Sequence, residues 1–357
     1  MTRVLLSGYY GFDNLGDEAV LAATVAELRR RRPGLEIGVF SASPEATARA
    51  YGVTGLPRGR PRAVARALRG CDLFLSGGGS LFQDATSWRS PWYYLAILAA
   101  ARRYCRRTAV YAQGFEPARR PWVRRGIRHV LNGVDLVTVR DAFSAEVLAS
   151  EGVRRPRIVV SADPSFLLDP DVTPAVERER ARWGEGPHFG LAVRPWGDGR
   201  ALRAAAAAAR DAGRRLGVRW IFVPMHRPQD VAASAAVAAE IGGAVVVREA
   251  FTPREMLALV GGLDLLVGMR LHALIFAAAQ GVPVVPVAYD RKVAALAREL
   301  EEEAPLPAEG LDAAALAARI ERAAADRPAR GERLRRLAGT LRERAALSPA
   351  LAVELLA

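Results

Sequence analysis

The sequence predicts an α/β protein of two domains, each built on a parallel β-sheet. The chain has 357 residues, and at about 100–200 residues per domain this corresponds to two domains. Short apolar runs alternate with alanine- and arginine-rich helical segments almost throughout, and strands separated by helices form right-handed βαβ units. Hydrophobic residues make up 51% and charged residues 25%, which is typical of a globular protein and excludes a disordered or fibrous one.

The elements follow in order along the chain. In the first half, the predicted strands are Val4–Ser7, Glu36–Ser41, Leu73–Ser76, Thr108–Ala112, Leu136–Val139 and Arg157–Val160. Helical patterns such as Glu18–Arg32 and Pro61–Arg69 lie between them. In the second half, the predicted strands are Phe189–Val193, Trp220–Pro224, Ala244–Val247, Leu263–Val267 and Pro283–Val287. A segment rich in proline and aspartate at 168–174 predicts a linker. We therefore expect domains at residues 1–167 and 175–329, then an arginine-rich helical segment, 330–357, that packs back across the boundary.

Several classes of site are absent from the sequence. The single lysine, Lys292, lies in Asp-Arg-Lys-Val, so there is no P-loop, and no strict GxGxxG occurs. The four histidines are scattered without an HExxH motif, and we expect no metal site. Cys71 and Cys105 form no CxxC pair, which indicates reduced thiols in a cytoplasmic protein. We see no signal peptide, and the longest apolar stretch, Pro91–Ala101, is far shorter than the ~20 residues of a transmembrane helix.

Positive charge is concentrated in the first half. Residues 1–165 carry 25 arginines against 14 acidic residues, whereas residues 166–357 carry 26 basic against 24 acidic residues. The first half is therefore expected to meet something anionic, such as phosphate, nucleic acid or acidic lipid headgroups.

Unusual residues follow nearly every predicted strand. Open parallel sheets bind ligands outside the carboxyl ends of their strands. In the first half these ends carry Gly8 to Glu18, Gly77-Gly78-Gly79-Ser80 with Gln83-Asp84, Gln113-Gly114, Arg140-Asp141 and Asp163. In the second half they carry Arg194-Pro195-Trp196, His226 with Asp230, Arg248, Gly268-Met269-Arg270-Leu271-His272 and Tyr289-Asp290-Arg291-Lys292. We expect a ligand-binding cleft lined by these segments.

Two glycine-rich loops of the first half are candidate binding loops. Gly77 to Ser80 lets the backbone approach a ligand and directs helix N–H groups at an anion, although a tight strand-to-helix connection has the same glycines. The loop from Gly8 ends in acidic residues that either cap the following helix or, with Asn14 and Asp17, contact substrate.

Four groups of the second half form the strongest candidate site. Arg270 and His272 follow one strand, and Arg291 and Lys292 follow the next. Neighbouring strands lie about 4.8 Å apart, so these groups converge if the two strands pair. Groups that are or can be cationic repel one another unless an anion lies among them. Lys292 is also one lysine among 51 basic residues, either by chance or because a compact ammonium is needed there.

Aromatic and basic residues are interleaved in two segments of the first half. Trp88–Arg107 and the arginines around Trp122 suit a membrane interface, but a helix that covers the sheet has the same apolar run. The sequence leaves these alternatives open. Arg140-Asp141 likewise either faces the cationic cluster across the cleft or forms a surface ion pair.

With these segments in place, the sequence resembles the polysaccharide pyruvyl transferase family, in particular its CsaB-type cell-wall enzymes. The resemblance rests on ordered motifs between about residues 3 and 295, namely Gly8 to Ala19, Ser76 to Asp84, Val139-Arg140-Asp141, Ala162 to Ser165 and Gly268-Met269-Arg270-Leu271-His272.

The resemblance implies two facing Rossmann-like domains, as in GT-B glycosyltransferases. It implies transfer of pyruvate from phosphoenolpyruvate to a sugar, with a 4,6-ketal and phosphate as products and no cofactor. For CsaB-type members the acceptor is N-acetylmannosamine on a lipid-diphosphate-linked cell-wall precursor, whose ketal S-layer homology domains bind. The partners expected are thus this acceptor and an anionic membrane surface at the inner face of the cytoplasmic membrane, and no nucleic acid. The oligomeric state stays open.

The resemblance also suggests roles for individual residues. His272, Lys292 and Arg140 correspond to the family's functional positions, with His272 as the general acid. Arg270, Arg291, Lys292, Arg140 and Gly268 are expected to hold the donor. Acceptor-side or cleft-lining residues are expected to be Tyr10, Asn14, Asp17, Gly77, Gly78, Gly79, Ser80, Gln83, Asp84 and Asp163.

Two other functions are compatible with parts of the sequence. A nucleotide-sugar glycosyltransferase has the same two-domain shape and would bind a nucleoside diphosphate in the second domain. A basic polyanion-binding protein would show spread charge without a converging histidine and lysine.

Overall fold

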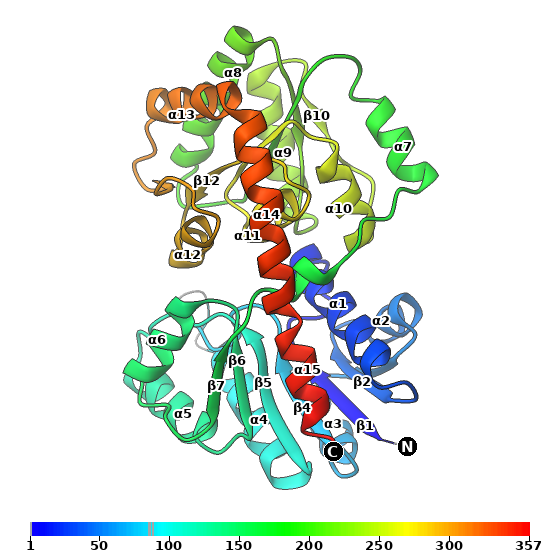
Figure 1. Cartoon of the computed structure of the whole chain (residues 1–357). Coiled ribbons are helices and arrows are strands. Elements are labelled where there is room, and N and C mark those ends of the chain that lie inside the picture. The colour runs from blue at the N-terminus through cyan, green and yellow to red at the C-terminus, as the bar shows by residue number, and fades with distance from the viewer. Residues whose placement is uncertain (1, 85–86, 88) are drawn as a thin grey trace. The chain divides into compact units, whose positions relative to one another are not determined.

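The computed structural model describes residues 2–84, 87 and 89–357 and divides them into two compact units. The first unit contains the chain up to Leu167 together with Leu341–Ala357, and the second unit is the continuous stretch Leu168–Thr340. Each unit is an α/β sandwich (Figure 1).

The first unit has a seven-stranded parallel sheet in the order β3-β2-β1-β4-β5-β6-β7. Its strands are β1 Arg3–Ser7, β2 Glu36–Ser41, β3 Thr54–Pro57, β4 Leu73–Gly77, β5 Arg107–Gln113, β6 Leu136–Val139 and β7 Arg157–Val160. Its helices from the N-terminal stretch are α1 Leu15–Arg31, α2 Pro44–Tyr51, α3 Pro61–Leu68, α4 Arg89–Tyr104, α5 Pro121–Leu131, α6 Ala142–Ser150 and the short 3₁₀ helix η1 Pro164–Leu167. The chain leaves β1 toward one edge of the sheet and β4 toward the other, so the sheet has its topological switch point between these paired strands.

Alternating strand residues give this sheet two apolar faces. Leu5, Phe74 and Val110 pack under helices α3 to α6. Leu6 and Leu75 pack on the other face, against α1 and the C-terminal helix α15 (Leu347–Glu354). Because both faces are covered, the strands read as continuous apolar runs in the sequence.

The second unit has a six-stranded sheet in the order β10-β9-β8-β11-β12-β13, also parallel. Its strands are β8 His188–Ala192, β9 Arg219–Phe222, β10 Val245–Val246, β11 Leu265–Gly268, β12 Val284–Ala288 and β13 Leu306–Pro307. Its helices are α7 Pro174–Ala181, α8 Arg200–Leu216, α9 Gln229–Ile241, α10 Pro253–Gly261, α11 Leu271–Ala279, α12 Arg291–Glu299 and α13 Ala313–Ala325. The switch point lies between β8 and β11, and an alanine-rich face of α8 packs with α9 and α13 on one side of the sheet.

The fold class predicted from the sequence, two α/β domains with parallel sheets, is confirmed. The sequence did not predict two edge strands. β3 contains a glycine and a proline, and β13 is two residues long, so neither has the run of β-branched or aromatic residues that marks a strand.

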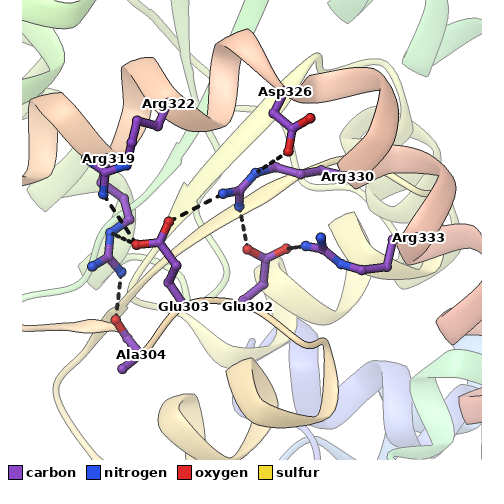
Figure 2. Close-up of polar contacts among 8 residues, drawn as sticks. All are labelled: Glu302, Glu303, Ala304, Arg319, Arg322, Asp326, Arg330 and Arg333. Carbon is purple, nitrogen blue, oxygen red and sulfur yellow. Dashed lines mark hydrogen bonds and ion pairs between the residues drawn. The ribbon is translucent and has the colours of Figure 1, made fainter.

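Helix α14 (Arg327–Ala345) begins in the second unit and ends in the first. An ion-pair cluster fixes its beginning, and Figure 2 shows the Glu302 carboxylate between Arg330 and Arg333. Arg330 Nη1 lies 2.5 Å and Arg333 Nη2 2.6 Å from that carboxylate, whose side chain is 2% exposed. Burial raises the pKa of the Glu302 carboxyl, and the two guanidinium groups oppose that shift. The cluster thus ties the first turns of α14 to the segment that follows α12.

The C-terminal end of the chain is part of the first unit's core. The Ser348 hydroxyl bonds to the hydroxyls of Thr138 (2.9 Å) and Ser161 (2.8 Å), and all three side chains are buried. Leu351 and Leu356 pack into the apolar cluster that includes Leu21, Val25 and Leu28 of α1.

Candidate functional site

Both glycine loops of the first unit lie at its switch point, because they follow the paired strands β1 and β4. The buried Tyr10 hydroxyl donates a hydrogen bond to the carbonyl of Gly77 (3.0 Å), which joins the two loops. Gly78 and Gly79 have φ values of +87° and +66°, where a side chain would be strained. A Cβ at Gly79 would lie 2.7 Å from Asp17 Oδ1, so this buried carboxylate directly adjoins the glycine loop.

The polar residues at the end of the first loop have two kinds of partner, the N-terminus of α1 and the loop itself. Asn14 is the N-cap of α1, and its side chain accepts from the Gly16 N–H at 3.2 Å. The Glu18 carboxylate accepts from the Gly11 N–H (2.7 Å) and the Tyr51 hydroxyl (2.7 Å). Asn14 thus stabilises the start of α1 and Glu18 stabilises the loop, whereas Asp17 lies beside the glycine loop.

Arg140 is buried at the end of β6 among polar groups of three segments. Its Nη2 donates to Ser80 Oγ (3.3 Å), its Nε donates to Asp141 (3.4 Å), and its Nη1 lies 4.0 Å from Asp163. A Cβ on Gly114 would lie 2.3 Å from its Nη2, so the guanidinium rests directly on that backbone. Arg140 is therefore more than a surface ion pair, since its side chain is only 7% exposed and it joins the glycine loop to two carboxylates.

Asp84 organises the basic segment before α5. Its carboxylate accepts from the backbone N–H groups of Arg119 (2.9 Å) and Arg120 (2.8 Å), and it is buried. Gln83 precedes it and is half-buried. The arginines before Trp122 are thereby held next to the segment that follows the glycine loop.

In the second unit, β11 and β12 pair in parallel, with Gly268 opposite Pro286. The segments that carry Arg270 with His272 and Arg291 with Lys292 therefore leave the sheet side by side. His272 is half-buried in the first turn of α11, and Arg291 is exposed at the start of α12.

Arg270 is held by Asp230, which the sequence placed at the same edge of the sheet but gave no role. Its Nε donates to Asp230 Oδ2 (2.8 Å), and its Nη2 bonds to Asp230 Oδ1. Asp230 is fully buried and also accepts from the N–H groups of Met225 (3.1 Å) and His226 (3.0 Å). The charge of Arg270 is thus compensated within the protein. The sequence shows an aspartate in the first turn of the helix that follows β9. Nothing in the sequence links it to Arg270, because the two residues are 40 positions apart.

Lys292 is also paired. Its Nζ lies 2.8 Å from Asp290 and 5.1 Å from the centre of the Tyr289 ring. Burial lowers the pKa of Lys292, but Tyr289 and Asp290 raise it by more, so that the net shift is upward and the ammonium stays charged. Asp290 also caps α12 through the Val293 N–H.

Three further side chains surround this position. Arg194 and Trp196 follow β8, and Arg194 lies over the Tyr289 ring, which follows β12. The sequence placed all three at the carboxyl edge of the sheet but gave them no role.

Helices α4 and α5 present an aromatic and basic surface. Trp92 is 52% exposed and stacks on Trp122 with 5.2 Å between ring centres. Helix α4 also buries Tyr94, Leu95 and Leu98 in the core, so it both packs in the fold and exposes a tryptophan. Trp88, where the predicted interface segment begins, lies outside the described residues. We define the tryptophan–arginine surface as Trp92, Trp122 and the exposed Arg119, Arg120, Arg124 and Arg125.

Within the described part of the chain, no helix has the length and apolar character to cross a membrane. Nor do three or more histidine, cysteine, aspartate or glutamate side chains gather there as metal ligands would.

The model of the polysaccharide pyruvyl transferase family matches residues 14–291, which include the Gly77–Ser80 loop and the Arg270–His272 segment. The chain belongs to this family. No curated protein matches the sequence.

Solved structures of the same fold are distant in sequence. HepE from Anabaena in complex with UDP-glucose is 15% identical, with a TM-score of 0.66 over 100% of this chain and 99% of its own. The UDP-GlcNAc 2-epimerase from Neisseria meningitidis bound to UDP-GlcNAc is 10% identical, with a TM-score of 0.66 over 100% and 99%. A glycosyltransferase from Rickettsia africae is 11% identical, with a TM-score of 0.67 over 99% and 97%. These likenesses confirm the GT-B-like fold and are limited to the fold.

The Arg270–Asp230 pair yields a stability prediction. Asp230→Ala leaves a guanidinium and two backbone N–H groups without their shared acceptor, and removal of one partner of a buried pair costs about 3–5 kcal/mol. We expect the free energy of unfolding, measured by urea denaturation, to fall by about that amount. The control is Asp211→Ala, whose partner Arg214 is 71% exposed, and here about 0–1 kcal/mol is expected. Equal losses for both variants would contradict the structural role of Asp230.

Proposed function

We propose that this protein transfers pyruvate from phosphoenolpyruvate to a sugar, forming a 4,6-ketal and releasing phosphate. The family membership supports a pyruvyl transferase. The observation that carries the donor assignment is the pairing of β11 with β12, which brings a histidine and cationic groups to one edge. Phosphoenolpyruvate has a carboxylate and a phosphate, and fixed cations suit both.

The reaction needs one proton donor and no external reductant or oxidant. His272 gives a proton to the methylene carbon, which becomes the methyl group and leaves an oxocarbenium-like centre. One sugar hydroxyl attacks this carbon and forms the first C–O bond. Phosphate then departs with the C–O bond that held it, and the second hydroxyl closes the ring. One hydroxyl proton returns to His272 and restores its acid form, and the other leaves with phosphate, so the atoms of donor and diol are all found in ketal and phosphate.

Each cation is proposed to have a different part in binding the donor. Lys292, positioned by Asp290, is the proposed phosphate contact. Arg291 precedes it in the segment after β12, and the Gly268–Arg270 segment lies at the end of the neighbouring strand β11. Arg270 acts mainly through position, because Asp230 compensates its charge. In the first unit, Arg140 is the proposed anion contact, beside Ser80.

The first unit is proposed to serve the acceptor. For a CsaB-type member this is N-acetylmannosamine on a lipid-diphosphate-linked cell-wall precursor. Tyr10, Asp17 and the glycine loop offer close backbone approach and a buried carboxylate for sugar hydroxyls. The tryptophan–arginine surface would hold the protein at the anionic inner face of the cytoplasmic membrane, where such an acceptor resides.

A nucleotide-sugar glycosyltransferase is the second candidate. It is favoured by the fold, because related structures hold UDP-glucose or UDP-GlcNAc. Thermal shift separates the candidates, since a pyruvyl donor site is stabilised by phosphoenolpyruvate and a glycosyltransferase by UDP-sugars.

The transfer itself is tested with the purified protein, phosphoenolpyruvate and a panel of lipid-linked and synthetic saccharide acceptors. We expect phosphate release that depends on the acceptor, and a product heavier by one pyruvate less one water in mass spectrometry. Release of a nucleotide from a UDP-sugar, with no phosphate from phosphoenolpyruvate, would replace this proposal by the second candidate.

The roles of His272 and Lys292 predict different kinetic defects. His272→Ala should lower kcat by about 10²- to 10⁴-fold with phosphoenolpyruvate binding largely kept, because a general acid acts in the transition state. Lys292→Ala should instead raise KM for phosphoenolpyruvate. The control is His188→Ala, because His188 begins β8 at the opposite end of the strands. Near-normal turnover of the His272 variant would refute its assignment.

The tryptophan–arginine surface predicts binding to anionic vesicles that salt weakens. In sedimentation with phosphatidylglycerol vesicles, Trp92→Ala with Arg125→Glu should reduce binding about tenfold or more, since each basic residue near such a surface contributes about 1 kcal/mol. Val172→Ala with Arg178→Glu, which changes exposed residues of the second unit, should bind like the original protein. No binding at low salt, or equal binding to neutral phosphatidylcholine vesicles, would exclude an electrostatic membrane surface.

A further inference from the structure

Arg194 lies at the switch point of the second unit. It follows β8, and its guanidinium carbon lies 4.2 Å from the centre of the Tyr289 ring, which follows β12. Since β11 lies between these two strands in the sheet, the Arg194–Tyr289 contact passes over the end of β11. Trp196 packs against the same tyrosine, with 5.2 Å between ring centres. Arg194 is therefore next to the segment that carries Arg270 and His272.

Arg194 differs from Arg270 and Lys292 in how its charge is compensated. Arg270 is bound by Asp230, and Lys292 by Asp290. In the part of the chain that the structure describes, Arg194 has no carboxylate within ion-pair distance, and its buried Nε has no hydrogen-bond partner. A buried donor without an acceptor costs free energy, which an anion at this position would recover.

The Tyr289 ring gives Arg194 a fixed orientation. A guanidinium over an aromatic face is attracted by the ring and keeps its N–H groups at its outer edge. Lys292 Nζ lies 5.1 Å from the centre of the same ring. One ring thus carries two cations of different shape, a planar fork and a compact ammonium.

We propose that Arg194 binds the carboxylate of the donor, an inference that rests on the pyruvyl transfer proposed above. The donor has two anionic groups, and Lys292 is assigned to the phosphate. The fork of Arg194 matches a carboxylate through two parallel hydrogen bonds, which an ammonium cannot make. Arg194 is thus a donor-binding residue that selects for an enol phosphate with a free carboxylate, and Tyr289 positions it.

The first test compares Arg194→Met with Arg194→Lys. Arg194→Met should raise KM for phosphoenolpyruvate about 10- to 100-fold, the loss expected for a hydrogen bond between charged groups, with a smaller effect on kcat. Arg194→Lys should recover part of this loss, because it keeps the charge without the fork. Arg200→Met removes an arginine that is 84% exposed and paired with Asp198, and it should leave KM unchanged. If the Arg194→Met variant has the same melting temperature as the original protein and an unchanged KM, the proposal is overturned.

The second test identifies the group that Arg194 contacts. Dissociation constants are measured for phosphoenolpyruvate and for its carboxyl methyl ester, with the original protein and with Arg194→Met. If Arg194 binds the carboxylate, the ester binds weakly to the original protein, and the substitution weakens the ester no further. If the substitution weakens both ligands equally, Arg194 contacts the phosphate or acts at a distance, and the assignment is wrong. Failure of the original protein to bind phosphoenolpyruvate at all would instead refute the proposed function.

Discussion

In both sheets, the chain leaves two paired central strands toward opposite edges, β1 and β4 in the first unit and β8 and β11 in the second. All strands of a parallel sheet end at the same edge, and the two diverging connections leave a gap there that backbone does not fill. This constraint positions the residues of the candidate site. It places the glycine loops and Asp17 at one such point, and Arg194 and the Arg270–His272 segment at the other.

Buried carboxylates determine which cations at these edges remain available to an anion. Arg140 lies beside Asp141 and Asp163, and Arg270 is bound by Asp230. The number of arginines therefore overstates the positive charge that a ligand meets. A guanidinium paired with a carboxylate has a fixed position but adds little net charge. In the second unit, Arg270 and Lys292 are both paired with carboxylates, whereas Arg194 has no carboxylate within ion-pair distance among the described residues.

The sequence predicted much of the fold and part of the candidate site. The long apolar strands and the residues after them could be identified because buried parallel strands are continuous apolar runs, and β11 and β12 pair as the candidate cluster requires. The short edge strands β3 and β13 lack that pattern. The bond between Arg270 and Asp230 was also beyond sequence reasoning, because it joins segments 40 residues apart whose loops meet only in three dimensions. Asn14 illustrates a local ambiguity, since capping and substrate contact need the same residue type, and the structure gives it the cap.

The path of the chain has a consequence for synthesis on the ribosome. The second unit is continuous in sequence, whereas the first unit's core includes Leu351 and Leu356, which emerge after the whole second unit. Domains generally fold as units while the chain grows. The second unit can therefore fold during translation, but the first must wait with part of its β-sheet uncovered until α15 is released. During that interval the exposed apolar face beside α1 is where the nascent protein is most open to aggregation and to chaperones.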